Sequence, residues 1–410
     1  MSAPADHHPE IGVMLYDNPK ECKAGWASIA GAEAMYMRSH ADLANHVIWV
    51  TNSEFSAFQM LGHRHVHNLR GTSFFRTPLY QMAADLGIPM AGHFAKSAAQ
   101  QLAKIAMRIL TLGAMAYEWK PGELFNADAL HENIKSRFPR DTLPNDPRLE
   151  HALRSAYQTD SAVSRADFVP NSIFLTLRMN RLLHAKNILA CPIPDDGWGY
   201  LSNRQLPVNA KERLAMCLNS EAPVLAEVVV DMTRADAAYG ALAAFGQKVA
   251  SRMVLREWVS HPELIWLAQC APIEIRSVFK STQYQPLKHA LPTVLSEDPL
   301  LALSYSAGLL AENHWTALAS DEYNRLTKKR TLSSRAVWLR AADRAFCFAL
   351  AKYALDQGFA VTGYSSGAVR VRVLRAELLH VLSFAIEHGL VCPDLNRLIQ
   401  PDDLQSVHSG

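Results

Sequence analysis

Three histidines close together in the sequence have the spacing of metal ligands. His63, His65 and His67 are each separated by one residue. On a β-strand alternate side chains point to one face, so the three imidazoles would converge on one ion. On a helix only His63 and His67 would share a face. Because imidazole is a common ligand of zinc and other divalent metals, the sequence predicts a candidate metal site here.

Two carboxylates are the acids best suited to join these histidines. Asp17 follows the apolar run 11–16, and Glu54 comes shortly after the apolar run 47–51. Acids at strand ends can hold two divalent metals in a hydrolytic site, which favours a metal-dependent hydrolase or nuclease as one hypothesis. Against it, residue 52 is Asn rather than Asp, and no HExxH motif occurs. The same residues also fit turns and hydrogen-bonded loops.

The second candidate is a concentration of positive charge near the C-terminus. Residues 325–375 hold eleven basic and two acidic residues, a formal charge of +9, whereas the whole chain carries +2. A local positive field attracts polyanions even when the whole molecule is nearly neutral. We expect seven of these basic residues to contact phosphates of DNA or RNA: Lys328, Lys329, Arg330, Arg340, Arg344, Arg370 and Arg372.

The spacing of these residues predicts how three groups of them are presented. In the run 369–373 valine and arginine alternate, so the valines would face a core while Arg370 and Arg372 face solvent together. Arg340 and Arg344 are four residues apart and would share one helix face. The Lys-Lys-Arg cluster 328–330 comes just before that helix.

The basic segment also fits two roles that involve no nucleic acid. Residues 297–322 contain five acids and no Lys or Arg, so the basic segment would pair with them or with a neighbouring subunit. Alternatively, the chain is a helical scaffold or assembly protein without a small ligand. The leading hypothesis is a non-catalytic nucleic-acid-binding protein that works with protein partners in a larger nucleoprotein assembly. It requires no cofactor, and only the hydrolase hypothesis requires a divalent metal.

The elements that would position these residues follow from periodicity and turn signals. Short strands are predicted over 11–16, 24–29 and 47–51, and a long helix over 94–119. Later helices are predicted over 173–186, in shorter pieces over 262–295, and over 300–319. The C-terminal region is predicted to contain a helix capped by Ser333 or Ser334, a β-hairpin over 359–374 and a helix over 377–387.

These patterns predict an α+β protein. The N-terminal half would hold a small mixed sheet with helices, and the mainly α-helical C-terminal half would end in a helix–β-hairpin–helix unit. The expected organisation is a disordered tail 1–10, a mixed domain 11–205 and a mainly helical domain 206–410 that carries the basic segment 325–375. No two of the six cysteines are closer than 26 residues, which argues against paired zinc ligands. Without a targeting signal or a long apolar stretch, we expect a cytoplasmic protein with no membrane contact.

Overall fold

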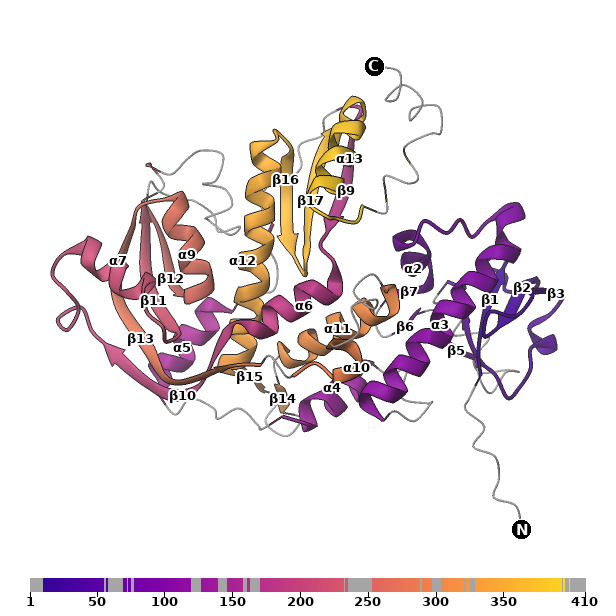
Figure 1. The fold of residues 1–410 in the computed structure, drawn as a ribbon, viewed down its shortest axis with the longest axis horizontal. Helices are drawn as coiled ribbons and strands as arrows, with labels where there is room; N and C mark the ends of the chain where they lie inside the picture. The colour runs from indigo at the N-terminus through magenta and orange to yellow at the C-terminus, as the bar shows by residue number, and fades with distance from the viewer. Residues whose placement is uncertain are drawn as a thin grey trace, which may run out of the picture. The chain divides into compact units, whose positions relative to one another are not determined.

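The computed structural model describes most residues between 10 and 392, together with residues 394 and 398. Within this range the description leaves out residues 55–56, 58–68, 72, 75–76, 119–126, 139–145, 158–160, 163–169, 232, 235–252, 288–289, 297–303, 321 and 325–328. The predicted disordered tail 1–10 also lies outside the described residues, except for Glu10. Figure 1 shows the order of the elements along the chain.

The chain divides into two compact units that each combine segments far apart in the sequence. Unit 1 consists of residues 1–134, 291–313 and 393–410, and unit 2 of residues 135–290 and 314–392. The boundary predicted near residue 205 therefore falls inside unit 2. Helices and sheets are mixed in the chain, so the predicted α+β class is confirmed.

Unit 1 is built on a five-stranded mixed sheet in the order β3-β2-β1-β4-β5. The strands are β1 (Ile11–Tyr16), β2 (Gly25–Ile29), β3 (Met35–Met37), β4 (Ile48–Thr51) and β5 (Leu69–Gly71). β1 pairs antiparallel with β2 and parallel with β4, so the sheet is mixed as predicted. All six residues of β1 are buried, as expected for a central strand covered on both faces.

The predicted long helix of unit 1 is present and packs against β1 and β2. It is α3 (Ala95–Tyr117), and its apolar stripe buries Leu102, Ala106 and Ile109. The other elements of the N-terminal segment are η1 (His40–Asp42), β6 (Ser73–Phe74), β7 (Thr77–Pro78), α2 (Leu79–Asp85), η2 (Gly92–Phe94) and α4 (Ala127–Ser136). From the second segment come α10 (Thr293–Ser296) and the start of α11 (Tyr305–Leu318).

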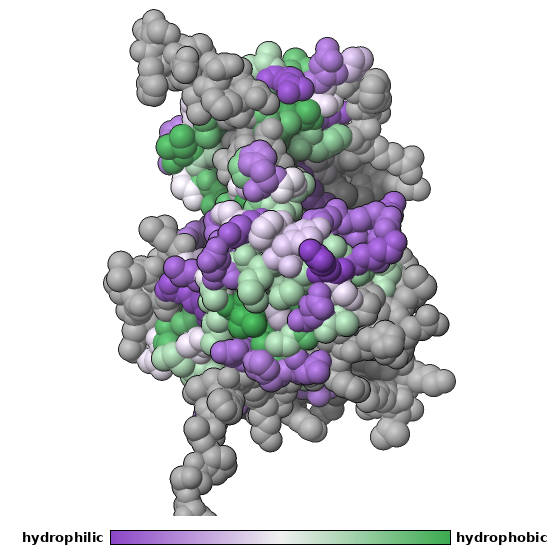
Figure 2. Space-filling model, turned by 90° about the vertical axis from the view of Figure 1, so that its right-hand side faces the viewer, coloured by the Kyte–Doolittle hydropathy of each residue, from purple (hydrophilic) through white to green (hydrophobic). Residues whose placement is uncertain are grey.

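The outer strand β3 of unit 1 exposes two large side chains, Met35 at 59% and Tyr36 at 48%. Figure 2 views the side on which β2 and β3 lie in Figure 1, and hydrophilic and hydrophobic residues intermingle on it. Scattered apolar residues of this kind are normal on a water-exposed surface and mark no site by themselves.

The described residues of unit 2 form two four-stranded sheets. The first has the order β10-β13-β11-β12 and is antiparallel throughout. Its strands are β10 (Pro192–Leu201), β11 (Val224–Asp231), β12 (Met253–Ser260) and β13 (Ile273–Pro286). The second has the order β8-β16-β17-β9 and is also antiparallel. Its strands are β8 (Ser161–Ala162), β9 (Ser172–Arg178), β16 (Ala360–Ser365) and β17 (Ala368–Leu374).

The helix α12 (Ser334–Asp356) contacts strands of both sheets and lies between them (Figure 1). Ser333 caps it by accepting a hydrogen bond from the backbone N–H of Ala336, as the sequence predicts. Buried side chains lie on all its sides, which identifies a core helix rather than a surface helix. The remaining elements of unit 2 are α5 (Pro147–Ala156), α6 (Arg181–Ala190), α7 (Ala210–Leu218), α9 (His261–Cys270), β14 (Glu322–Asn324), β15 (Lys329–Thr331), η5 (Arg375–Glu377) and α13 (Leu378–Glu387).

Two of the helices predicted above are not present as predicted. The helix predicted over 173–186 is the strand β9 followed by α6, because Asn180 starts a new helix by capping the N–H of Leu183. The helices predicted over 262–295 include a strand of 14 residues, β13. The C-terminal half is therefore less helical than expected, although α12, β16, β17 and α13 do form the predicted helix–hairpin–helix series.

Candidate functional site

The predicted metal site is only partly within the described structure. His63, His65 and His67 lie outside the described residues. Asp17 and Glu54 do follow the ends of β1 and β4, which are neighbouring parallel strands, so both lie at one edge of the sheet. Asp17 accepts a hydrogen bond of 2.6 Å from the hydroxyl of Tyr36. The carboxylate of Glu54 lies 3.9 Å from the amine of Lys20.

Asn52 is at a position where a two-metal site would need a carboxylate, and its amide bonds to the backbone of β1 instead. Its Oδ1 accepts from the backbone N–H of Tyr16 at 2.8 Å, and its Nδ2 donates to the carbonyl of Tyr16 at 3.0 Å. The side chain thus continues the ladder between β1 and β4 after the backbone bonds end. An Asp would accept but could not donate, so the amide has a structural role here.

The described residues contain one cluster with three possible metal ligands, and it is in the core of unit 2. His184 of α6 and Asp343 and Cys347 of α12 place their ligand atoms within 4.8 Å of one another, and all three are buried. Asp343 Oδ1 lies 2.8 Å from His184 Nε2 and accepts from Gly367 N at 2.9 Å, while Oδ2 accepts from Ser366 N at 2.8 Å.

The hydrogen bonds of this cluster join α6, α12 and the turn between β16 and β17. Burial alone would raise the pKa of Asp343, but the His184 hydrogen bond and charge, with the two backbone N–H groups, hold that pKa below its usual value. Burial and the nearby Asp343 charge raise the pKa of Cys347 well above that of a free thiol.

Arg344 is in the core and is paired. Its side chain is 1% exposed, and its Nε and Nη2 donate to the two carboxylate oxygens of Glu263 at 2.9 and 3.0 Å. Nη2 also reaches the carbonyl of Ala156 at 3.2 Å. The phosphate contact predicted for Arg344 is therefore not available in this fold, because α12 is buried between two sheets.

Arg340 is half-buried one turn earlier on α12. Its guanidinium lies 5.2 Å from the ring centre of the buried Trp315, a cation–π contact. Its Nε is buried without a hydrogen-bond partner among the described residues. Lys329 and Arg330 belong to β15, where they pair with Asn324 and Tyr323, but their side chains lie outside the description, as does all of Lys328.

Arg370 and Arg372 lie as the alternation of β17 predicts. Val369, Val371 and Val373 are buried, while Arg370 is exposed and Arg372 is half-buried on the opposite face. The Arg370 guanidinium takes part in none of the hydrogen bonds or ion pairs found among the described residues.

The neighbouring strand β9 adds residues that the sequence did not reveal. Phe174 pairs with Arg372, Thr176 with Arg370, and Arg178 with Ala368. Directly opposed residues of antiparallel strands share a face, so Phe174 and Arg178 join the arginines of β17. We call this surface the arginine face and define it as Phe174, Arg178, Arg370, Arg372 and Leu374. Alternation of Ile173, Leu175 and Leu177 was the sequence signal for β9, but an apolar run of this length also fits a helix.

The strands of this sheet contribute only positive charge to the arginine face, and the Glu377 carboxylate lies at its end, where it accepts from the backbone N–H of Leu374 at 2.7 Å. None of the sheet's four strands contains Asp or Glu, and three arginines project from one side. Phe174 is 56% exposed and Leu374 is 44% exposed. Arg178 donates to the carbonyl of Ser366 at 3.4 Å, which holds it beside the hairpin turn. The face therefore combines positive charge with an exposed aromatic ring.

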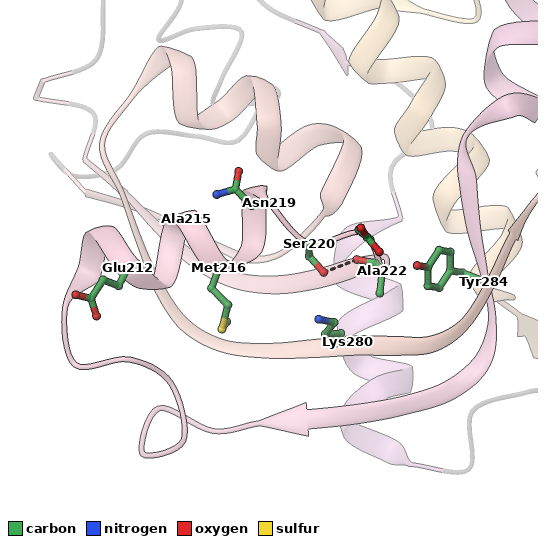
Figure 3. A pocket seen from close by; sticks show the side chains of 9 residues that line it. Glu212, Ala215, Met216, Asn219, Ser220, Ala222, Lys280 and Tyr284 are labelled. Carbon is green, nitrogen blue, oxygen red and sulfur yellow. Dashed lines mark hydrogen bonds between the residues drawn. The ribbon is translucent and has the colours of Figure 1, made fainter.

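A second feature of unit 2 is a pocket between α7 and β13. Figure 3 shows Glu212 and Met216 on the helix and Lys280 and Tyr284 on the strand, with Ser220 Oγ donating to the carbonyl of Ala222. Its charged groups have opposite signs, and none of its lining residues belongs to the metal-ligand cluster described above. The pocket therefore does not indicate a particular ligand.

Comparisons with known proteins leave the family open. No protein-family model and no curated protein matches the chain. Among solved structures, Phi29 DNA polymerase with primer-template DNA (the post-translocation binary complex) gives a TM-score of 0.46 at 10% identity, covering 88% of this chain and 80% of the polymerase. Its ternary complex with primer-template DNA and incoming nucleotides gives 0.43 at 9% identity, with the same coverage. At these values the likeness establishes neither a shared fold nor a shared activity. Among the described residues, no helix has the length and apolar character needed to cross a membrane.

Proposed function

We propose that this protein binds nucleic acid through the arginine face of unit 2. The observation that carries the proposal is the exposed Arg370 beside Arg372 on a sheet without acidic residues. A guanidinium presents a planar fork of donors that matches the oxygens of a phosphate. Such contacts release counterions from the nucleic acid, so the binding is driven largely by electrostatics.

The interface proposed here is smaller than the basic segment. Arg344 is left out because it is paired with Glu263 in the core, and Arg340 because it stacks on Trp315. Contacts by Lys328, Lys329 and Arg330 stay predictions. The role as a non-catalytic part of a larger nucleoprotein assembly, and the metal-dependent alternative at residues 63–67, also stay predictions.

The test is charge reversal of the two arginines of β17. We expect the R370E/R372E double variant to lose at least about tenfold in affinity for DNA and RNA oligonucleotides at low salt. Neutral R370Q/R372Q should lower the slope of log affinity against log salt by about 1 for each phosphate contact removed. Affinity would be measured by fluorescence anisotropy over a series of salt concentrations.

A matched control separates the proposed face from net charge. Arg204 and Lys211 are exposed residues of unit 2 outside this sheet, and R204E/K211E changes the net charge equally. We expect it to weaken binding much less than R370E/R372E. Equal binding by the wild type and R370E/R372E, in proteins with unchanged circular dichroism, would refute the proposal.

A further inference from the structure

Phe174 occupies a position on the arginine face that the fold itself does not require to be aromatic. The other side of β9 buries Leu175 and Leu177 in the core, and Phe174 points away from them. On the open side of such a strand a polar residue would be the ordinary choice. Instead a phenyl ring is left 56% exposed to solvent.

The neighbours of Phe174 match the parts of a nucleotide. Arg372 is directly opposite on β17, and side chains at such positions lie about 5 Å apart at Cβ. Arg370 is two residues further along β17, about 6.6 Å away along the strand. A base lying on the phenyl ring would thus have its phosphates within reach of two guanidinium groups.

We infer that the arginine face binds single-stranded rather than double-stranded nucleic acid, with Phe174 stacking on an unpaired base. This inference rests on the function proposed above and specifies its ligand. In a duplex both faces of each base are covered by its neighbours, so a ring on a flat sheet has nothing to stack on. In a single strand the base face is free, and four-stranded sheets that display aromatic rings bind RNA in this way.

Charge complementarity selects a polyanion over a protein partner for this face. Its apolar part consists of Phe174 and the partly exposed Leu374, and these two are diagonal neighbours across the strands. Its remaining members are three arginines. A stable protein–protein interface needs a fully buried apolar centre with few charges, which this composition does not provide.

The experiment compares a single-stranded oligonucleotide with a hairpin duplex of the same base composition at one salt concentration. We expect tighter binding of the single strand, and an F174A affinity for it about 5-fold to 100-fold lower, because stacking one base contributes that much. Duplex affinity should change less than twofold. F174W should retain single-strand binding, and F174L should behave as F174A, because leucine keeps apolar area without a ring.

The outcomes separate this inference from the proposed function. If R370E/R372E weakens binding but F174A does not, or if both ligands bind equally well, the stacking inference fails and the proposed function stands. Recovery of binding in F174L would also overturn it, because an apolar contact would then suffice. If neither variant changes binding, the proposed function fails as well. Phe94, 45% exposed in unit 1, provides the control variant F94A, which should bind as the wild type.

Discussion

The imidazole of His184 and the carboxylate of Asp343 meet in the core of unit 2, with Nε2 and Oδ1 2.8 Å apart. The same carboxylate accepts the backbone N–H groups of Ser366 and Gly367 in the turn between β16 and β17. One buried side chain on α12 therefore joins a second helix, α6, to the hairpin that carries the arginine face.

Removing this carboxylate should destabilise unit 2 strongly. D343A leaves two backbone donors and His184 without their acceptor in a buried place, which should cost about 3–5 kcal/mol. D343N retains one acceptor oxygen and should cost less. Urea denaturation followed by circular dichroism would measure both variants. If D343A unfolds at the wild-type urea concentration, the junction does not stabilise the fold.

Replacing Gly367 by a residue with a side chain should destabilise the protein, because its backbone has a positive φ and His184 lies close to the position of a Cβ. Its φ of +67° is in the left-handed region, and a Cβ there would lie 2.8 Å from Cδ2 of His184. G389A provides a matched control, because Gly389 has φ of +60° with nothing within 4 Å of the added atom. Backbone strain of about 1 kcal/mol should affect both, and G367A should lose clearly more stability than G389A. Equal losses in urea denaturation would contradict the predicted clash.

The buried pair of Arg344 and Glu263 predicts a strongly non-additive response to mutation. R344M leaves an unpaired carboxylate in the core and should cost about 3–5 kcal/mol. The double variant R344M/E263M replaces both charges with apolar groups and should be closer to the wild type than either single variant. A double-mutant cycle from urea denaturation checks this, and additive losses would refute the coupling.

His314 predicts a loss of stability in mild acid. Burial, together with the smaller effect of the Arg137 charge, lowers the pKa of His314 to about 3. Below the unfolded value of about 6.5 the unfolded chain therefore binds a proton that the folded chain does not, so stability falls as the pH drops. From pH 6.5 to about pH 5 this contributes a loss of about 2 kcal/mol. The variant H314L should lack this contribution to the loss of stability. Parallel profiles of unfolding free energy against pH for the two proteins would show that His314 does not cause the loss.

The sequence predicted the part of the arginine face that belongs to β17, but it did not predict the part contributed by β9. Alternation in 369–373 placed Arg370 and Arg372 on the solvent side because a strand has a period of two residues. The partner strand was missed because its pairing joins residues such as Phe174 and Arg372 from distant parts of the chain. Periodicity carries no information about such pairing.

Arg344 shows the same limit for a buried charge. A stripe of arginines on a helix suggests a solvent-facing surface, since arginine is seldom buried without a partner. The partner in this case is Glu263, 81 residues earlier on α9. In β13, the buried Ile273 and Ile275 alternate with the exposed Glu274 and Arg276. This two-residue alternation could have predicted the strand from the sequence. The prolines around it led instead to a prediction of short helices.

The pairing of β9 with β17 has a consequence for how the protein is made. Leu177 pairs with Val369, which the ribosome adds 192 residues later. At about 5–20 residues per second, the nascent β9 waits roughly 10–40 s for its partner. During that interval its edge is unpaired and Leu175 and Leu177, which the folded protein buries, are exposed, and such strands associate readily with other chains. A product truncated before β16 would therefore contain Phe174 and Arg178 without Arg370 and Arg372, which complete the face.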